Sequence, residues 1–228
     1  MIERLRRSAA HVFVDNINSP ELNDDDAHHL LRVLRIRESD EVSVSNGQGA
    51  WCMASIAANG EVHVISEVNR EVEPSWRVGV GFVPVKGEKP ELAVQKLTEV
   101  GVDDIVVVAS ARRQVVKWED DRRKRNMERL AKVAREAAMQ SRRTRLPVLS
   151  VLGGVADLAR AGAAVAEPNG DPLTPDDRFV VIGPEGGFTE EELGGFDKKV
   201  SLGDFVLRAE TAAIVAGVML TDLRGRAS

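Results

Sequence analysis

The chain contains the run Val181-Ile182-Gly183-Pro184-Glu185-Gly186-Gly187-Phe188-Thr189-Glu190-Glu191-Glu192-Leu193, which reads as a buried strand, a glycine loop and the start of a helix. Gly186 and Gly187 let the backbone approach a bound group without an intervening side chain. Thr189 and Glu192 have the spacing of a capping box, which marks the N-terminus of a helix. A strand that ends in such a loop is typical of a ligand site in an α/β sheet.

A second junction of the same kind follows at Val200-Ser201-Leu202-Gly203-Asp204-Phe205-Val206-Leu207-Arg208-Ala209-Glu210-Thr211-Ala212-Ala213. Either loop alone is also compatible with an ordinary strand-to-helix turn. Two glycine loops at the carboxyl ends of neighbouring strands, however, form a crevice. The first loop is not followed by Gly-Lys-Ser/Thr, so it is not a P-loop, and no dinucleotide-binding fingerprint occurs.

The two loops, GPEGG and LG-x-x-VLR-x-ETA, resemble those of the SPOUT-class methyltransferases, in particular the bacterial small-subunit ribosomal RNA uridine-N3 methyltransferases. The resemblance extends to HHLLRVLR at 28–35, QKLTEVGVDD at 95–104 and QSRRTRLP at 140–147. It implies an α/β fold in which a C-terminal SPOUT-type parallel sheet is tied into a trefoil knot. It also implies a small N-terminal PUA-like β-barrel, a homodimer, and S-adenosyl-L-methionine bound in the knot. The implied substrate is a uridine in 16S ribosomal RNA of the small ribosomal subunit.

The resemblance implies cofactor contacts from three loops and the start of the last helix. These residues are Ala166, Glu167, Ile182, Gly183, Pro184, Glu185, Gly186, Gly187, Leu202, Gly203, Leu207, Thr211 and Ala212. Glu185 is also compatible with a surface carboxylate at a helix start, and Thr211 with a helix cap.

The candidate catalytic residues are Arg208 and Glu210. Methyl transfer from a sulfonium is an in-line displacement that needs no metal, so alignment of the reacting groups does most of the work. N3 of uracil carries a proton that must leave before it attacks. Because no histidine occurs after His63, we hypothesise that Arg208 stabilises the uracil anion. The alternatives are that Arg208 pairs with Glu210 or with an RNA phosphate, and that Glu210 caps its helix.

The chain departs from the family pattern at two places. Relatives commonly have Glu-Gln-x-Gly-Arg where this chain has Met139-Gln140-Ser141-Arg142-Arg143. They often have a basic residue in the third loop, where this chain has Asp204-Phe205. The first departure leaves an RNA contact by Arg142 open. The second affects cofactor binding little, because the contacts expected there come mostly from the backbone.

The net charge of -5 conceals a strong asymmetry. Residues 1–73 carry 7 Lys/Arg against 13 Asp/Glu, whereas residues 112–145 carry 13 against 5. Local phosphate neutralisation suffices for RNA binding. The run Arg122 to Arg125 also fits a solvated helix face. Arg142, Arg143 and Arg145 lie in the break before Pro147, where the sequence shows no helix that needs them. The predicted RNA-binding residues are Arg4, Arg7, Arg32, Arg35, Arg142, Arg143 and Arg145.

Two domains are predicted, at 1–73 and 74–228. In the first, Asn46-Gly47 and Asn59-Gly60 separate strand-like runs, which indicates a β-meander. A helix capped by Asn23 places Ala27, Leu30, Leu31 and Leu34 on one stripe, which we expect to lie in the core. The four histidines all fall in this domain and have no metal-ligand spacing, so we expect packing or capping roles and no metal site.

In the second domain, strands and helices alternate, which predicts a parallel sheet covered on both faces. The expected strands are 76–83, 104–109, 148–151 and 163–167, followed by the two glycine junctions. The expected helices include 90–100, 119–140, 155–161 and 210–223. The last of these is apolar at Ala212, Ala213, Val215, Ala216, Met219 and Leu220, more than one sheet face needs, which favours a homodimer.

One cysteine, Cys52, excludes an internal disulfide, and no apolar run is long enough to span a membrane. The arginine-rich start lacks an apolar signal core, so we expect a cytoplasmic protein. Two other functions stay open. One is SPOUT methylation of another base atom or of a ribose 2'-hydroxyl, and the other is a non-catalytic RNA-binding factor in ribosome assembly.

Overall fold

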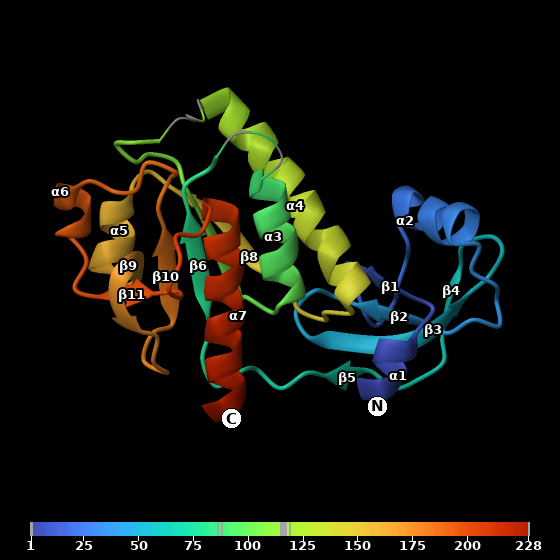
Figure 1. Cartoon of the computed structure of the whole chain (residues 1–228). Coiled ribbons are helices and arrows are strands. Elements are labelled where there is room, and N and C mark those ends of the chain that lie inside the picture. Colours follow the sequence, from blue (N-terminus) through green and yellow to red (C-terminus); the bar gives the residue numbers. More distant parts are fainter. Residues whose placement is uncertain (1, 86, 88, 115–117, 119, 228) are drawn as a thin grey trace. The chain divides into compact units, whose positions relative to one another are not determined.

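The computed structural model describes residues 2–85, 87, 89–114, 118 and 120–227 (Figure 1). The chain forms two compact units. The first comprises Met1–Glu73 and Arg135–Leu146, and the second comprises Pro74–Ala134 and Pro147–Ser228. Residues 135–146, which the sequence ranges place in the second domain, therefore pack with the first unit. The reason is visible in the core, because Met139 contacts the buried apolar cluster of the first unit.

The first unit contains a sheet in the order β1-β2-β3-β4, with β5 paired to β3. Its strands are β1 (Ala10–Phe13), β2 (Val42–Ser45), β3 (Ala50–Ile56), β4 (Val62–Val64) and β5 (Asn69–Arg70). β1 and β2 are parallel, and β2, β3 and β4 form the predicted antiparallel meander. Gly47 and Gly60 have φ angles of 73° and 88°, which glycine adopts without strain.

The helical part of this unit differs from the expected single helix. After α1 (Ile2–Arg7), the chain forms α2 (Asp24–His28), which Asn23 caps, and continues directly into the π-helix η1 (His29–Val33). Leu30 is fully buried, but Leu34 is 46% exposed. The prediction that Leu34 lies in the core is therefore wrong, because the wider π turn rotates the residues that follow it.

The second unit contains a parallel sheet in the order β11-β9-β10-β6-β7-β8. Its strands are β6 (Gly79–Phe82), β7 (Asp104–Val108), β8 (Val148–Leu152), β9 (Ala164–Pro172), β10 (Phe179–Ile182) and β11 (Lys199–Ser201). Its helices are α3 (Lys89–Glu99), α4 (Asp120–Ser141), α5 (Val155–Arg160), α6 (Glu190–Leu193) and α7 (Ala209–Ala227), of which α4 ends in the first unit. The expected start of α4 at residue 119 lies outside the described residues.

Apolar cores cover both faces of this sheet. Ile105 and Val107 of β7 pack in one core with residues of α3 and α7, whereas Val106 and Val108 pack in another with residues of α5. Successive side chains of a strand point to opposite faces, so the alternation places the two cores on opposite sides. The prediction of a parallel sheet covered on both faces is confirmed. The trefoil knot stays a prediction.

Candidate functional site

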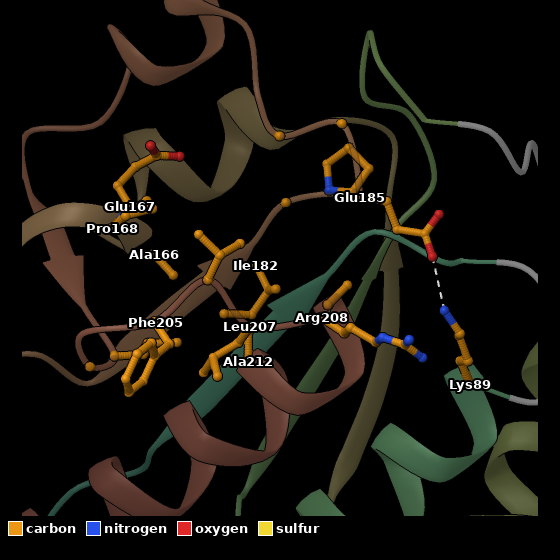
Figure 2. Close-up of a pocket in the computed structure, with 18 residues that line it drawn as sticks. Lys89, Ala166, Glu167, Pro168, Ile182, Glu185, Phe205, Leu207, Arg208 and Ala212 are labelled. Atoms are coloured by element: carbon orange, nitrogen blue, oxygen red, sulfur yellow. Dashed lines mark hydrogen bonds and ion pairs between the residues drawn. The ribbon is translucent and has the colours of Figure 1, made fainter.

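A cavity of about 850 Å³ lies in the second unit, where β10 and β11 end and α7 begins (Figure 2). Every residue proposed for the cofactor lines it except Thr211, whose side chain is exposed on the first turn of α7. Arg208 also lines it. Phe205 and Val206 also line it, and they lie in the stretch 202–207 that the sequence places at the cofactor. The structure adds three residues that sequence reasoning did not select, namely Lys89, Pro168 and Ala209.

The glycine loop that forms one wall follows from its sequence. β10 ends at Ile182, and the Gly187 amide donates to the Pro184 carbonyl at 2.8 Å. Gly187 has a φ of 67°, a backbone conformation that other residues adopt at a cost. Adding a Cβ at Gly186 would bring it within 3.3 Å of the Arg113 Cβ. The Arg113 guanidinium also donates to the Gly186 carbonyl at 3.1 Å, so Arg113 packs directly on this loop.

The predicted capping box after the loop is present. The Thr189 hydroxyl accepts from the Glu192 amide, and the Glu192 carboxylate accepts from the Thr189 amide at 2.8 Å. The same carboxylate accepts from the Arg112 amide at 2.9 Å. Burial acts to raise the pKa of Glu192, but the hydrogen bonds from the Thr189 and Arg112 amides outweigh it and hold that pKa below its usual value. Glu192 therefore stays ionised at neutral pH and fixes the end of the glycine loop.

The opposite wall comes from the loop between β11 and α7. Phe205 and Val206 are 84% and 87% exposed, an unusual state for two adjacent apolar side chains that also border the cavity. The Arg208 carbonyl accepts from the Ala212 amide at 2.8 Å, so Arg208 stands immediately before the first turn of α7.

The cavity has a mostly apolar side, on which Glu167 also lies, and a charged side. Figure 2 shows Ala166, Ile182, Leu207 and Ala212 close together, with Phe205 beside them. Arg208 extends away from them towards the side where Glu185 and Lys89 lie. Such a division suits a ligand with a flat apolar part and a charged part.

Lys89, the first residue of α3, is the main functional candidate that the sequence did not reveal. Its ammonium donates to Glu185 Oε1 at 2.8 Å and lies 3.6 Å from Glu210 Oε1. Among the described residues, no ion pair joins Glu210 to Arg208, which was one alternative for Arg208. Glu210 does not line the cavity, and its catalytic role stays a prediction. No local sequence pattern marks Lys89, because its partners Glu185 and Glu210 are distant in sequence.

The arginines proposed for RNA lie in the first unit in different settings. Arg7, Arg32 and Arg35 are exposed, although Arg7 forms an ion pair with Glu3 at 2.5 Å. Arg4 pairs with Glu41, Arg145 pairs with Glu73 at 3.5 Å, and Arg143 is half-buried.

Arg142 has a structural role that the sequence did not suggest. Its guanidinium donates to the Ser8 and Met139 carbonyls at 2.9 Å, and burial lowers its pKa. The expectation that no helix needs Arg142 is wrong, because it terminates α4.

The described residues contain no group of three or more His, Cys, Asp or Glu side chains placed to hold a metal ion. His11 is buried, with Nδ1 at 2.8 Å from the Ser43 hydroxyl, and burial lowers the pKa of His11 to about 4. This histidine therefore packs as a neutral side chain at neutral pH. In the part of the chain that the structure describes, no helix combines the length and apolar character needed to cross a membrane.

Comparisons with known proteins agree on one family. The protein-family model described as RNA methyltransferase domain matches residues 72–221. The family model described as RNA methyltransferase PUA domain matches residues 22–67. The protein named "Ribosomal RNA small subunit methyltransferase E" from Bacillus subtilis is 30% identical over 227 residues, with 86% of each chain covered. Its namesake from Mycobacterium bovis is 32% identical over 219 residues, covering 86% of this chain and 83% of the relative.

A solved structure from Legionella pneumophila, described as a methyltransferase in complex with the bound cofactor SAM, has the same fold. Its TM-score is 0.82 at 26% identity, and the match covers 95% of this chain and 98% of the other.

Proposed function

Because the chain belongs to the RNA methyltransferase family, we propose that it uses S-adenosyl-L-methionine to methylate N3 of a specific uridine in 16S ribosomal RNA. The observation that carries this proposal is the cavity between the two glycine loops, which lies within the matched region. The substrate would be naked 16S RNA or the small ribosomal subunit, in the cytoplasm.

The cavity fits the cofactor in size and in chemistry. Its volume of about 850 Å³ lies within the roughly 300–1,000 Å³ typical of small-ligand sites. The apolar side, with Ala166, Ile182 and Leu207, suits the adenosine, and the loop from Gly183 to Gly187 offers backbone groups to the polar part. The Legionella relative binds this cofactor in the same fold. When bound, the cofactor supplies an activated methyl group.

Arg208 is the residue that we propose to act on the acceptor. A uracil whose N3 has lost its proton carries a negative charge, which a guanidinium at the edge of the cavity stabilises. A positive charge about 4 Å from the uracil anion, in a medium of effective dielectric about 20, stabilises the anion by roughly 4 kcal/mol. This lowers the pKa of N3 by about three units at most. That shift brings the N3 proton close to the range in which it leaves at neutral pH.

The RNA must present an unpaired uridine, because N3 lies on the pairing edge of the base. We propose that the exposed Arg7, Arg32 and Arg35 of the first unit contact RNA phosphates. Arg4, Arg143 and Arg145 would contribute less, since they are partly buried or paired within the unit. We also propose that the active form is a homodimer.

Nucleoside mass spectrometry of 16S ribosomal RNA from a deletion strain tests the function. We expect N3-methyluridine to disappear and to return with the wild-type gene, but not with Arg208→Ala. In vitro, Arg208→Ala should keep its cofactor affinity and RNA affinity, lose methylation at neutral pH, and regain part of it as pH rises, because hydroxide then removes the proton. Arg160→Ala, which removes an exposed arginine of α5, is the matched control.

Wild-type methylation by Arg208→Ala at neutral pH would contradict the role of Arg208. Loss of a ribose-methylated or another base-methylated nucleoside would move the activity to a different atom. An unchanged nucleoside profile together with no cofactor binding would instead identify a non-catalytic assembly factor.

A further inference from the structure

Lys89 occupies a special place beside the cavity, because it contacts both glycine junctions at once. Its ammonium is 2.8 Å from Glu185, in the first loop (Figure 2). It is also 3.6 Å from Glu210, in the first turn of α7. Lys89 itself begins α3. Three segments that are far apart in sequence therefore meet at one ammonium group.

Burial makes this cluster more than a surface ion pair. The Glu210 side chain is only 12% exposed, against 31% for Lys89 and 55% for Glu185. Glu210 Oε2 is buried and has no hydrogen-bond partner among the described residues. A carboxylate in that position is costly unless a cation lies near it, so Glu210 depends on Lys89. The hydrogen bond that the Lys89 ammonium donates to the Glu185 carboxylate is the main cause that raises the pKa of Lys89, so the lysine stays charged.

The tip of the first glycine loop is contacted by side chains from outside the loop. Glu185 and Gly186 are both exposed, and the apolar anchors of the loop, Pro184 and Phe188, lie on either side of them. Lys89 holds Glu185, while Arg113 holds the carbonyl of the next residue. Without Lys89, the ion pair that holds Glu185 to the start of α3 is lost, and the loop gains freedom that a ligand must then remove.

We propose that Lys89 is a positioning residue of the cofactor site, which fixes the first glycine loop relative to the start of α7. The inference rests on the proposed cofactor and adds a residue to the site. Lys89 needs no direct contact with the reacting atoms for this role. It stabilises, before the ligand arrives, the loop arrangement that the ligand requires.

The charge of Lys89 provides a way to separate positioning from simple electrostatics. S-adenosylmethionine carries a net positive charge at neutral pH, whereas S-adenosylhomocysteine, without the sulfonium, is neutral overall. If Lys89 acted only through its charge, its removal would strengthen binding of S-adenosylmethionine and leave S-adenosylhomocysteine unaffected. A positioning role predicts weaker binding of both ligands by a similar factor.

The test compares Lys89→Met, Lys89→Arg and the control Lys96→Met by calorimetry with both ligands. Lys96 lies on the same helix and pairs with Glu99 at 2.8 Å, but it does not border the cavity. We expect Lys89→Met to raise both dissociation constants by about five- to tenfold. Lys89→Arg should recover most of the affinity, and Lys96→Met should match the wild type.

Hydrogen exchange of the ligand-free proteins gives a second readout that does not require binding. Amides of residues 183–187 should exchange faster in Lys89→Met than in the wild type or in Lys96→Met. Unchanged exchange, or tighter binding of S-adenosylmethionine alone, would overturn the inference. If the wild-type protein binds neither ligand, the proposed function fails, while the exchange comparison still decides the role of Lys89.

Discussion

At the scale of single residues, Arg142 is an unusual end for a helix. It adopts a φ of 60° just after α4, where glycine is usual. The Arg143 amide donates to the Ala138 carbonyl at 2.9 Å and the Arg142 amide to the Met139 carbonyl at 3.4 Å, which is the Schellman pattern. The family pattern has glycine at this position. The guanidinium bonds to the Ser8 and Met139 carbonyls offset the strain that the side chain introduces.

Two substitutions separate these opposing effects. Arg142→Ala removes the guanidinium hydrogen bonds and keeps the backbone strain. Arg142→Gly removes the same hydrogen bonds but also relieves the strain, because glycine adopts a positive φ freely. We expect both variants to be less stable than the wild type, with Ala below Gly by about 1 kcal/mol. Urea unfolding followed by tryptophan fluorescence measures the difference. An Ala variant as stable as the Gly variant would mean that the left-handed conformation costs little here.

The sequence predicts those site residues that belong to a local pattern, and it does not predict residues whose partners are distant in the chain. The glycine loops and Arg208 were selected because they form a local pattern with neighbours in sequence. Lys89 was missed because its partners Glu185 and Glu210 are about a hundred residues away, and an ion pair of that kind leaves no local signal.

At the scale of elements, β9 and β11 approach each other unusually closely at Gly170. A Cβ added there would meet the backbone of Val200 at 2.5 Å. The register of this pair shifts between Lys199 and Val200. Both strands lead into the cavity, since β9 carries Pro168 and β11 precedes Leu202.

We therefore expect Gly170→Ala to separate the two strands, because backbone atoms cannot move aside as a flexible side chain can. The expected loss is about 1–3 kcal/mol in the free energy of unfolding, with weaker binding of S-adenosylmethionine. Urea unfolding and calorimetry measure the two effects. Gly153→Ala is the control, because a Cβ there meets nothing within 4 Å. Equal behaviour of the two variants would show that β9 and β11 separate at little cost.

The elements that were predicted correctly have a clear period or a diagnostic turn. The meander follows from two Asn-Gly turns, and β7 is an apolar run from Ile105 to Val108 after Asp104. β1 was not predicted, because its four residues gain their strand structure only by pairing with β2, 32 positions further on. The π-helix η1 was missed for a related reason, since its sequence has an ordinary α-helical spacing up to Leu34.

At the scale of the whole molecule, the apolar surface of α7 is smaller than the sequence suggests. Ala212, Ala213, Ala216 and Leu220 are buried within the second unit, where they pack in its core. The large apolar side chains left for a partner are Ile214, Val215, Met219 and Leu223, which are half-buried, and Val218, which is 45% exposed.

The proposed homodimer can be tested through this remaining surface. If α7 packs against a second copy, Val218→Glu places a charge in the contact and should raise the dimer dissociation constant about tenfold or more. Light scattering at micromolar concentration should then report a dimer for the wild type and a shift towards monomer for the variant. Ala156→Glu, at an exposed position of α5, should stay dimeric. A monomeric wild type would refute the dimer.

The helix α4 has a consequence for how the protein is made. Two arginines from the end of α4 and the residues after it hold the first unit together. Arg135 pairs with Asp26 at 2.6 Å and donates to the Phe13 carbonyl at 3.1 Å, and Arg142 donates to the Ser8 carbonyl. During translation, residues 1–73 leave the exit tunnel long before these partners exist. The nascent chain must therefore wait for residue 146 before its N-terminal unit is complete, with residues 74–134 already outside the tunnel. The chain has no single point at which a cut would release both units whole.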